Sequence, residues 1–419
     1  MASLALMLPW YKSHASDDIL QLSTRLEKFN DTNADQLATD EDFWQYIQQA
    51  YTDSPGIINL NNGGVSPSPK VVQDAMKRYH DMSNEAPSYY MWRILDQGRE
   101  PLRERLAHMA GVDPEEIALQ RNASEALETV IFGLPLKAGD EVVLSKQDYP
   151  NMINAWKQRE QRDGLKLIWV DLQLPSTDNE YLTEAYTSVF SSRTKVVHIT
   201  HVINWNGQVL PVRQIADKAR NLGIEVLVDG AHSFAHIDFT IHELHCDYFG
   251  TSLHKWLSAC IGTGFLYVRK SKIKELYPLF AAEESQKENI RKFEALGTRP
   301  FFIEQATSKA LDFHQMIGSQ RKEARLFYLK KYWTDQLLDF EEVVLNTPMK
   351  RGFSGAIANI AIKDKKPEDL DAYLFEKHKI HTVTIHWANI DGVRITPNVY
   401  TSLADLDKLV RGIKEFVKQ

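Results

Sequence analysis

The stretch DYFGTSLHKWLSACIGTGFLYVR, residues 247–269, decides the fold and raises the question of what its lysine does. Two apolar runs, each typical of a buried strand, flank a polar segment that ends in His254 and Lys255. An ammonium group is costly to bury unless it is paired or deprotonated. A hydrophobic core therefore does not explain Lys255, whereas a lysine that reacts with a carbonyl group fits such surroundings.

The sequence around this stretch alternates between short apolar runs and amphipathic helical patterns. Helical patterns cover residues 124–134, 152–163 and 212–222, and Pro211 and Gly223 bracket the last of them. This alternation predicts an α/β fold in which a mostly parallel seven-stranded sheet lies between helices. The strands are expected at 117–120, 141–145, 166–172, 195–201, 225–229, 248–252 and 265–269.

After Pro300 the pattern changes, and a helical region that runs to Leu338 is followed by short strands mixed with helices. The strands are expected at 356–362, 382–386 and 392–395, and the helices at 367–377 and 402–418. We therefore predict an N-terminal arm and helices at 1–58, a large domain at 59–300 and a smaller C-terminal α+β domain at 301–419.

The composition is that of an ordinary globular protein, with 43% hydrophobic and 25% charged residues among 419. The 49 basic and 56 acidic residues give a net charge of −7 without long runs of one sign, so we expect neither a nucleic-acid partner nor a membrane partner. Cys246 and Cys260 are the two cysteines, and their apolar neighbours predict free buried thiols.

The N-terminal apolar run at Leu4–Trp10 is short for a secretory signal, lacks preceding basic residues and is far below membrane-spanning length. We interpret it as an arm that packs on the body of the protein or on a partner subunit. The alternative is the trimmed end of an export signal. The cytoplasm is therefore the default location, and the periplasm is the alternative.

Ligands of open α/β sheets bind beyond the carboxyl ends of the strands, so the residues just after each predicted strand are the candidates for a site. Taken alone, each polar residue there has an ordinary explanation, such as a helix cap, a turn or a lysine that reaches solvent. Together they predict a binding site, because strands far apart in the sequence carry such groups at matching ends. The groups are Ser124, Asp148 and Tyr149, Asn204, Asp229 and His232, and Ser252, His254 and Lys255.

Pyridoxal phosphate would use these groups. Lys255 supplies the amine that binds its carbonyl, and Asp229 supplies an anion for its ring nitrogen, which drains electrons only when protonated. The helix that opens at Ser124 offers free backbone amides to the phosphate, and Ser252 and His254 can close the other side. Tyr149 can stack on the ring.

The runs VDGAHSFAHIDF (228–239) and DYFGTSLHKW (247–256) resemble the cofactor-lysine region of the class V aminotransferase family of fold-type I pyridoxal-phosphate enzymes. This family includes cysteine desulfurases, kynureninases and isopenicillin N epimerase-like proteins, and the resemblance extends from about Asn59 to the C-terminus. It implies Lys255 as the Schiff-base lysine that forms the internal aldimine and Asp229 as the partner of the pyridinium. It further implies Tyr149 as the stacking residue, His232 beside the ring, Asn204 near the phenolic oxygen, and Ala123, Ser124, Ser252 and His254 around the phosphate.

Three further segments resemble the same family. GTRP (297–300) is similar to a loop that reaches the phosphate across the dimer interface in the isopenicillin N epimerase-like branch, which implies a homodimer with shared active sites and a role for Thr298 in the neighbouring site. GVRITPNVY (392–400) resembles the segment whose arginine, here Arg394, holds the substrate carboxylate. LNNGGVSPSP (60–69) resembles the segment that roofs the substrate, which implies substrate contacts from Asn62 and Gly63.

The branches of the family differ in the step that comes after loss of the α-proton. Cysteine desulfurases carry a persulfide-forming cysteine on a loop shortly before the carboxylate-binding arginine, and HTVTIHWANIDGVR (381–394) contains none. Desulfurase activity is therefore disfavoured. Tyr149, where desulfurase-like members carry histidine, and the GTRP loop favour the epimerase-like branch.

We therefore expect a pyridoxal-phosphate enzyme that acts at the α-carbon of an amino acid or of an amino-acid-like metabolite. Aminotransferase-type chemistry ranks first, and a C–S or β-elimination lyase or an amino-acid epimerase is the alternative. A protein that binds the cofactor without turnover ranks lower, and so does a nicotinamide dehydrogenase, because no G-x-G-x-x-G comes after the first strand. No metal site is expected.

Overall fold

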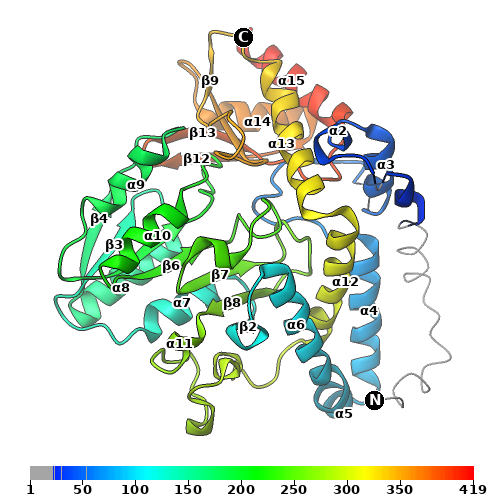
Figure 1. Cartoon of the computed structure of the whole chain (residues 1–419). Coiled ribbons are helices and arrows are strands. Elements are labelled where there is room, and N and C mark those ends of the chain that lie inside the picture. Colours follow the sequence, from blue (N-terminus) through cyan, green and yellow to red (C-terminus); the bar gives the residue numbers. More distant parts are fainter. Residues whose placement is uncertain (1–21, 23, 30, 53) are drawn as a thin grey trace.

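The computed structural model describes residues 22, 24–29, 31–52 and 54–419, and the run at Leu4–Trp10 lies outside them. A seven-stranded sheet in the order β2-β8-β7-β6-β5-β3-β4 forms the centre of the large part of the molecule (Figure 1). All neighbours are parallel except β8, which is antiparallel to β2 and β7. The strands are β2 (Ile117–Gln120), β3 (Glu141–Ser145), β4 (Lys166–Val170), β5 (Thr194–Thr200), β6 (Glu225–Asp229), β7 (Tyr248–Ser252) and β8 (Gly264–Val268).

This sheet confirms the predicted fold class, and the strand bounds differ by two residues at most. The strand predicted at 166–172 ends at Val170 because β4 is an edge strand whose only partner is β3. The last residue of β3, Ser145, pairs with Val170, so no neighbour is left to extend the ladder. Pairing with β3, rather than the apolar character of β4, sets its length.

Helices cover both faces of the sheet and create two apolar cores. Successive strand residues point to opposite faces, so Val142 and Leu144 join the core under one helix layer and Val143 joins the other. In α10 the buried residues Val212, Ile215, Ala216 and Ala219 recur with the period of a helix face. The first layer contains α7 (Ala123–Gly133) and α8 (Pro150–Asp163), and the second contains α6 (Arg99–Ala110), α9 (Asn179–Thr187) and α10 (Val212–Asn221).

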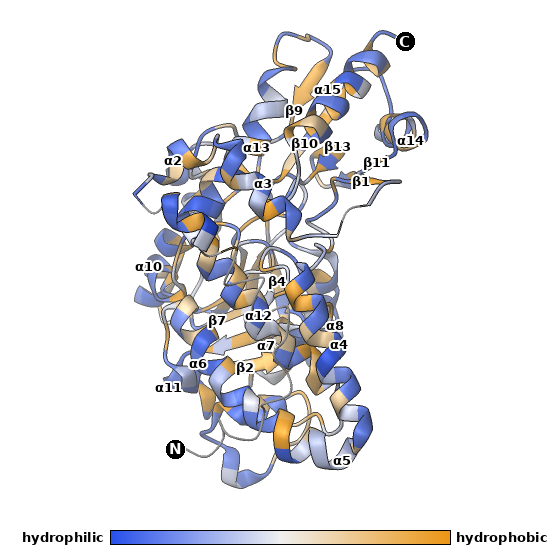
Figure 2. Ribbon diagram, turned by 90° about the vertical axis from the view of Figure 1, so that its right-hand side faces the viewer, coloured by the Kyte–Doolittle hydropathy of each residue, from blue (hydrophilic) through white to orange (hydrophobic). Residues whose placement is uncertain are grey.

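The N-terminal elements lead along the second layer. Helix α4 runs beside α12 (Figure 1), and both contribute to the same core. Figure 2 shows helices that alternate between hydrophilic and hydrophobic residues, as expected of helices with one buried face. The N-terminal elements are α2 (Ala34–Leu37), α3 (Glu41–Gln49), β1 (Ile58–Asn59), α4 (Lys70–Glu85), α5 (Pro87–Tyr89) and a π-helical turn η2 (Tyr90–Leu95). Helix α12 spans Phe301–Ile317.

The C-terminal part is built on a smaller antiparallel sheet in the order β12-β13-β10-β9, with its own apolar core. The predicted helical region from 301 to 338 consists of two helices, because α12 ends at Gly318, whose φ is 90°. Side chains of α12 pack in the core of the large sheet, and Leu329 and Trp333 of α13 pack in the smaller core. The division of the chain at residue 300 stays a prediction. The elements are α13 (Ser319–Asp335), β9 (Val343–Leu345), β10 (Ala358–Ile362), α14 (Pro367–His378), β11 (Ile380–His381), β12 (Val383–Trp387), β13 (Ile390–Ile395) and α15 (Leu403–Val417).

Two further properties of the described chain bear on the sequence predictions. Cys246 and Cys260 are free and buried, as predicted. Every helix that the structure describes is too short or too polar to cross a membrane.

Candidate active site

A cavity of about 550 Å³ lies at the carboxyl ends of the parallel strands. Its wall combines these strand ends with residues 63–64 and with the hairpin formed by β12 and β13. Of the predicted site residues, Asn62 and Thr298 do not line it. Those that do are Gly63, Ala123, Ser124, Tyr149, Asn204, Asp229, His232, Ser252, His254, Lys255 and Arg394.

Asp229 lies at the end of β6 and is only 4% exposed. Its Oδ1 accepts a hydrogen bond of 2.9 Å from the backbone N–H of Ala231. Burial raises the pKa of its carboxyl group, and Lys255 opposes that shift. Among the described residues Asp229 has no ion-pair partner, so a cationic group in the cavity would stabilise its charged form.

Lys255 comes shortly after β7, the neighbour of β6. Burial lowers the pKa of its amine to about 8, with a smaller lowering from Arg394 and an opposing effect of Asp229. Its Nζ lies 3.0 Å from Nε2 of His232. A lysine with this pKa is partly neutral near physiological pH, and the neutral amine is the form that attacks a carbonyl or takes a proton.

The start of α7 and the end of β7 meet at a potential anion site. The hydroxyl of Ser252 accepts a hydrogen bond of 2.9 Å from the backbone N–H of Ala123, which joins the two elements. Asn122 caps the helix by accepting a bond from the N–H of Glu125. The remaining N–H groups of a first helical turn have no partner within the helix, and the positive end of the helix dipole favours an anion such as a phosphate.

Three buried side-chain atoms that line this cavity have no hydrogen-bond partner among the described residues. They are Oδ1 of Asn204, Nδ1 of His254 and Nε of Arg394. Unpaired buried polar atoms are costly, so three of them around one cavity indicate a polar ligand. The carboxylate of Asp229, the amine of Lys255 and the helix start at α7 complement the ring nitrogen, the carbonyl and the phosphate of pyridoxal phosphate. The residues present therefore fit this cofactor.

Arg394 on β13 is 7% exposed, and its side chain lines the cavity. Burial lowers the pKa of its guanidinium to about 10, so the side chain stays charged at neutral pH. One terminal nitrogen donates to the backbone carbonyl of Asn204 (3.0 Å) and the other to Oδ1 of Asn61 (2.8 Å). These two bonds orient a cation at the cavity wall.

Asn61 was missed by the sequence analysis, which favoured its neighbour Asn62. Asn62 is fully buried, and its amide donates to the carbonyl of Thr396 at 2.9 Å and accepts from the hydroxyl of Tyr400 at 2.7 Å. It therefore anchors the 60–64 segment instead of facing the cavity. The two adjacent asparagines in LNNGG indicated a polar contact in this segment. Only the backbone conformation of the segment determines that Asn61, and not Asn62, faces Arg394.

Of the predicted residues Gly63 and Thr298, the first lines the cavity and the second does not. Gly63 lines the cavity, and a side chain there would meet Thr396 at 3.1 Å, so the close approach of two chain segments favours glycine. Thr298 is exposed and lies outside the cavity of its own chain. A role for Thr298 in a neighbouring subunit stays a prediction.

Two tryptophans beside the predicted Tyr149 were also missed. Tyr149 is 38% exposed, and its ring lies 6.3 Å from Trp205, which in turn lies 5.4 Å from Trp387 at the end of β12. Val383 and Ile385 of the same strand add apolar surface to the wall. The tryptophans of VINWNG and IHWANI were the available signal, but they are about 180 residues apart and nothing local indicates that they meet.

No cysteine lines the cavity in the described chain. Cys260 is buried elsewhere, and burial raises the pKa of its thiol to about 11. A thiolate is the reactive form of cysteine, so this residue is unsuited to nucleophilic chemistry.

Comparison with known proteins shows the family to which this chain belongs. The family described as "Aminotransferase class-V" matches residues 58–408. The chain belongs to this family of pyridoxal-phosphate enzymes, and the resemblance drawn from the sequence is confirmed.

Three similar proteins illustrate the range of the family. Isopenicillin N epimerase of Streptomyces clavuligerus is 28% identical over 388 residues, which cover 87% of this chain and 96% of the epimerase. The apo structure of cysteine desulfurase from Thermococcus onnurineus NA1 has a TM-score of 0.79 at 24% identity and covers 90% of this chain and 98% of that chain. A C-DES variant with glycine covalently linked to its pyridoxal-phosphate cofactor has a TM-score of 0.77 at 20% identity and covers 87% of this chain and 98% of that chain. These structures confirm the fold-type I architecture.

Proposed function

We propose that this protein uses pyridoxal phosphate to move the α-proton of an α-amino acid, and that epimerisation at the α-carbon is its reaction. One observation carries the proposal: two groups that can exchange protons, Lys255 and Tyr149, enter the same cavity from opposite sides of Asp229. In the sheet order, Lys255 comes after β7 on one side of β6, and Tyr149 comes after β3 on the other. Inversion at a carbon requires one group on each face to remove and return the proton, and we assign these two tasks to Lys255 and Tyr149.

The side chains of the cavity have separate tasks. Asp229 would hold the ring nitrogen of the cofactor in its protonated form, and the first turn of α7 would hold the phosphate. Arg394 binds the substrate carboxylate, which orients the α-carbon. When bound, the cofactor supplies an electron sink for the α-carbon. The neutral amine of Lys255 then removes the α-proton, and the hydroxyl of Tyr149 delivers a proton from the other face.

The similarity to isopenicillin N epimerases over most of the chain supports this choice of reaction. The missing cavity cysteine speaks against a persulfide-forming desulfurase. Transamination, which the sequence analysis ranked first, is the second candidate, because it would need only one group that moves a proton, and Lys255 can be that group. Elimination of a β-substituent is the third, since it begins with the same proton loss.

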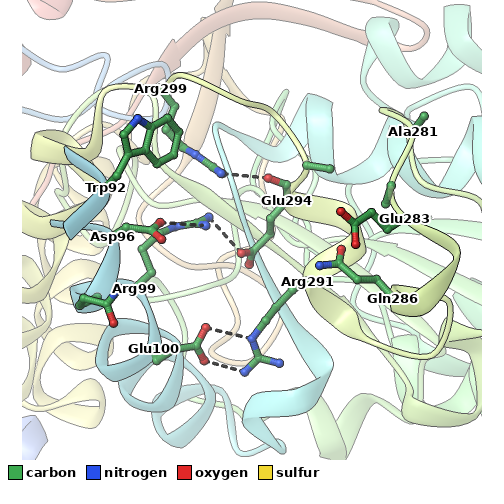
Figure 3. A pocket seen from close by; sticks show the side chains of 13 residues that line it. Trp92, Asp96, Arg99, Glu100, Ala281, Glu283, Gln286, Arg291, Glu294 and Arg299 are labelled. Carbon is green, nitrogen blue, oxygen red and sulfur yellow. Dashed lines mark hydrogen bonds and ion pairs between the residues drawn. The ribbon is translucent and has the colours of Figure 1, made fainter. Parts of the chain in front are cut away.

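We further propose that the enzyme is a homodimer whose sites are shared. A second cavity of about 550 Å³ is lined by residues between 92 and 100 and by the segment 281–299, and most of its lining side chains are charged or polar (Figure 3). Trp92 stands at its rim, 41% exposed, close to Arg299 in the loop that carries Thr298. Outside the cavity lining, Tyr89, Ile94, Tyr277 and Phe280 are exposed apolar residues that lie close in sequence to its two lining segments. Contact with a second copy would cover this surface and bring Thr298 toward the neighbour's cavity.

A panel of L- and D-amino acids tests the reaction. The cofactor-loaded protein is incubated with each compound in D₂O, and the products are resolved by chiral chromatography and mass spectrometry. Epimerisation gives the other enantiomer with deuterium at the α-carbon, transamination gives an oxo acid, and elimination releases ammonia. If no compound exchanges its α-proton, the proposed function is wrong.

The Tyr149→Phe variant tests the second proton donor. It keeps the ring but removes the hydroxyl, so inversion is expected to fall by about 10²–10⁴-fold while α-proton exchange with retention persists through Lys255. Tyr181→Phe, which changes a tyrosine hydroxyl outside the cavity that accepts from the N–H of Gln173, serves as the matched control. Equal loss of inversion and exchange in Tyr149→Phe would assign Tyr149 to cofactor binding alone.

A further inference from the structure

Three buried aromatic side chains lie directly behind Lys255, and we call His232, Trp256 and His236 the imidazole–indole cluster. The indole Nε1 of Trp256 lies 3.3 Å from Nδ1 of His232, and the other ring nitrogen of His232, Nε2, lies 3.0 Å from Nζ of Lys255. His236 stacks on Trp256 with ring centroids 3.7 Å apart and an interplanar angle of 13°. All three side chains are at most 5% exposed. The cluster thus connects the reactive amine to the protein interior.

The hydrogen-bond chemistry of indole determines where His232 carries its proton. The Nε1–H of tryptophan only donates, because the nitrogen lone pair belongs to the ring system. Nδ1 of His232 must therefore accept, and an accepting nitrogen is unprotonated. The proton of the neutral imidazole is then on Nε2, the atom that faces Lys255.

The opposite arrangement, in which Lys255 donates to Nε2, is unfavourable. It would place the imidazole proton on Nδ1, where it would face the N–H of Trp256 with no acceptor between them. A doubly protonated His232 would create the same conflict and add a buried charge. Burial lowers the pKa of His232 well below its usual value, with further lowering from Lys255, Arg394, His236 and His254. The geometry and the surrounding charges therefore agree on a neutral ring that donates from Nε2.

His236 holds the indole in place. Its Nδ1 donates to the backbone carbonyl of His232 at 2.7 Å, and its Nε2 accepts from the backbone N–H of Ala356 at 2.7 Å. Both of its nitrogens are thus used, which leaves the ring neutral and fixed. A side chain at Gly355 would lie 2.2 Å from Nε2 of His236, so the adjoining segment is shaped around this imidazole. A fixed ring stacked on Trp256 keeps the indole N–H directed at His232.

We propose that Trp256 is a positioning residue: supported by His236, it locks His232 as a neutral imidazole protonated on Nε2. His232 then donates a hydrogen bond to the nitrogen of Lys255 and cannot serve as the base of the site, which reserves that task for the lysine. Because a hydrogen bond from His232 requires a lone pair on Lys255, the lock favours the neutral amine. From the proposed function this inference takes only that Lys255 is the reactive amine.

Nitrogen NMR on the full-length chain, labelled with ¹⁵N-histidine, tests the lock directly. Two-bond proton–nitrogen correlations of the cofactor-free protein should show His232 with a bare Nδ1 and a protonated Nε2. In Trp256→Phe, which keeps an aromatic ring against His236 but loses the N–H, His232 should shift toward the Nδ1-protonated form. The ionisation midpoint of Lys255, measured through its reaction with an amine-specific reagent, should rise by about one pH unit, because the ammonium gains an acceptor.

Trp156→Phe is a matched control. The indole of Trp156 donates to Nδ1 of the buried His198 at the same distance of 3.3 Å, in the core of the large sheet. That variant should change the tautomer of His198 and leave His232 and Lys255 unchanged. An Nδ1-protonated His232 in the wild type overturns the proposal, as does an unchanged His232 tautomer in Trp256→Phe. Both spectra are recorded without substrate. The NMR result for His232 therefore stands even if the amino-acid panel shows no reaction, and the panel result stands even if the NMR spectra contradict the predicted tautomer.

Discussion

The two cationic side chains that line the described cavity, Lys255 and Arg394, have opposite requirements. The lysine must lose its proton to react, and the arginine must keep its charge to bind a carboxylate. Burial lowers both pKa values, to about 8 and about 10. The same physical effect serves both tasks, because the guanidinium begins from a much higher pKa than the amine.

Arg394→Lys should keep the charge and lose the two-pronged hydrogen bond to a carboxylate. We expect kcat/KM for the best amino acid to fall by about 30- to 1000-fold, which corresponds to about 2–4 kcal/mol of transition-state stabilisation. Cofactor absorbance without substrate should not change. Arg193→Lys, at an exposed arginine outside the cavity that pairs with Glu141, is the control and should have little effect. Normal turnover in Arg394→Lys would mean that the carboxylate binds elsewhere.

The lowered pKa of Lys255 predicts how cofactor capture depends on pH. Only the neutral amine attacks the carbonyl, so the rate of covalent capture should rise with pH and level off above about 8, whereas an ordinary lysine would level off above about 10. Asp229 favours the charged amine. Asp229→Asn should therefore lower the pKa further and move the plateau to lower pH. Stopped-flow absorbance measures both profiles, and a plateau near 10 in the wild type would contradict the assignment.

At the level of elements, the hairpin of β12 and β13 forms one wall of the cavity and contributes no cysteine to it. The indole of Trp387 donates to the carbonyl of Lys146 at 2.8 Å, and the amide of Gln147 donates to Asn389 at 3.1 Å. These bonds attach the hairpin to the segment that carries Tyr149. This part of the cavity wall is therefore a strand fixed by pairing and by side-chain hydrogen bonds. A fixed wall of this kind suits substrate binding better than it suits a nucleophile that has to move.

The 3₁₀-helix η7 (Ile290–Glu294) places the loop of Thr298, and one carboxylate holds it. Glu294 is 5% exposed and accepts from Arg103 (2.5 and 3.0 Å) and from the backbone N–H of Leu119 at 2.6 Å. Its Oε2 also lies 3.0 Å from a terminal nitrogen of Arg99, within the network drawn in Figure 3. This buried carboxylate joins η7 to β2 and α6.

Glu294→Ala should be strongly destabilising, because it leaves the buried guanidinium of Arg103 without its main anion. Loss of one partner of a buried ion pair costs about 3–5 kcal/mol, which for a chain of this length predicts a melting temperature lower by roughly 3–6 °C. Glu115→Ala is the control: it removes a partly exposed partner of Arg291 and should cost at most about 1 kcal/mol. Calorimetry measures the melting temperature of both variants. An equally small decrease in both would show that Glu294 does not hold this segment.

At the scale of the whole molecule, the proposed dimer predicts that inactive subunits can restore each other. Lys255→Ala and Thr298→Asp should each be inactive alone, the first without the amine and the second through repulsion of the phosphate. Mixed dimers should contain one intact site, so an equal mixture should regain about one quarter of wild-type activity. The double variant in one chain should regain nothing when mixed with itself. Full activity in a monomeric fraction would refute shared sites.

Local sequence determined the strands and the residues at their ends. β2, β3, β6 and β7 begin and end where the apolar runs predict. Parallel strands bring their carboxyl ends to one edge, so placing Lys255, Asp229 and Tyr149 on strand ends was enough to predict that they meet. The presence of Asp229 and Lys255 in one cavity is a consequence of this strand arrangement.

Contacts between distant segments were decided by the tertiary structure alone. Arg394 meets Asn61 across 333 positions, and Trp256 meets His232 across 24 positions that include the whole of β7. Periodicity indicates which face of a strand is buried, but it does not indicate which of two adjacent asparagines faces an arginine. The sequence therefore determined most of the groups that reach the cavity, and packing determined which neighbours they contact and which of their atoms are left without a protein partner.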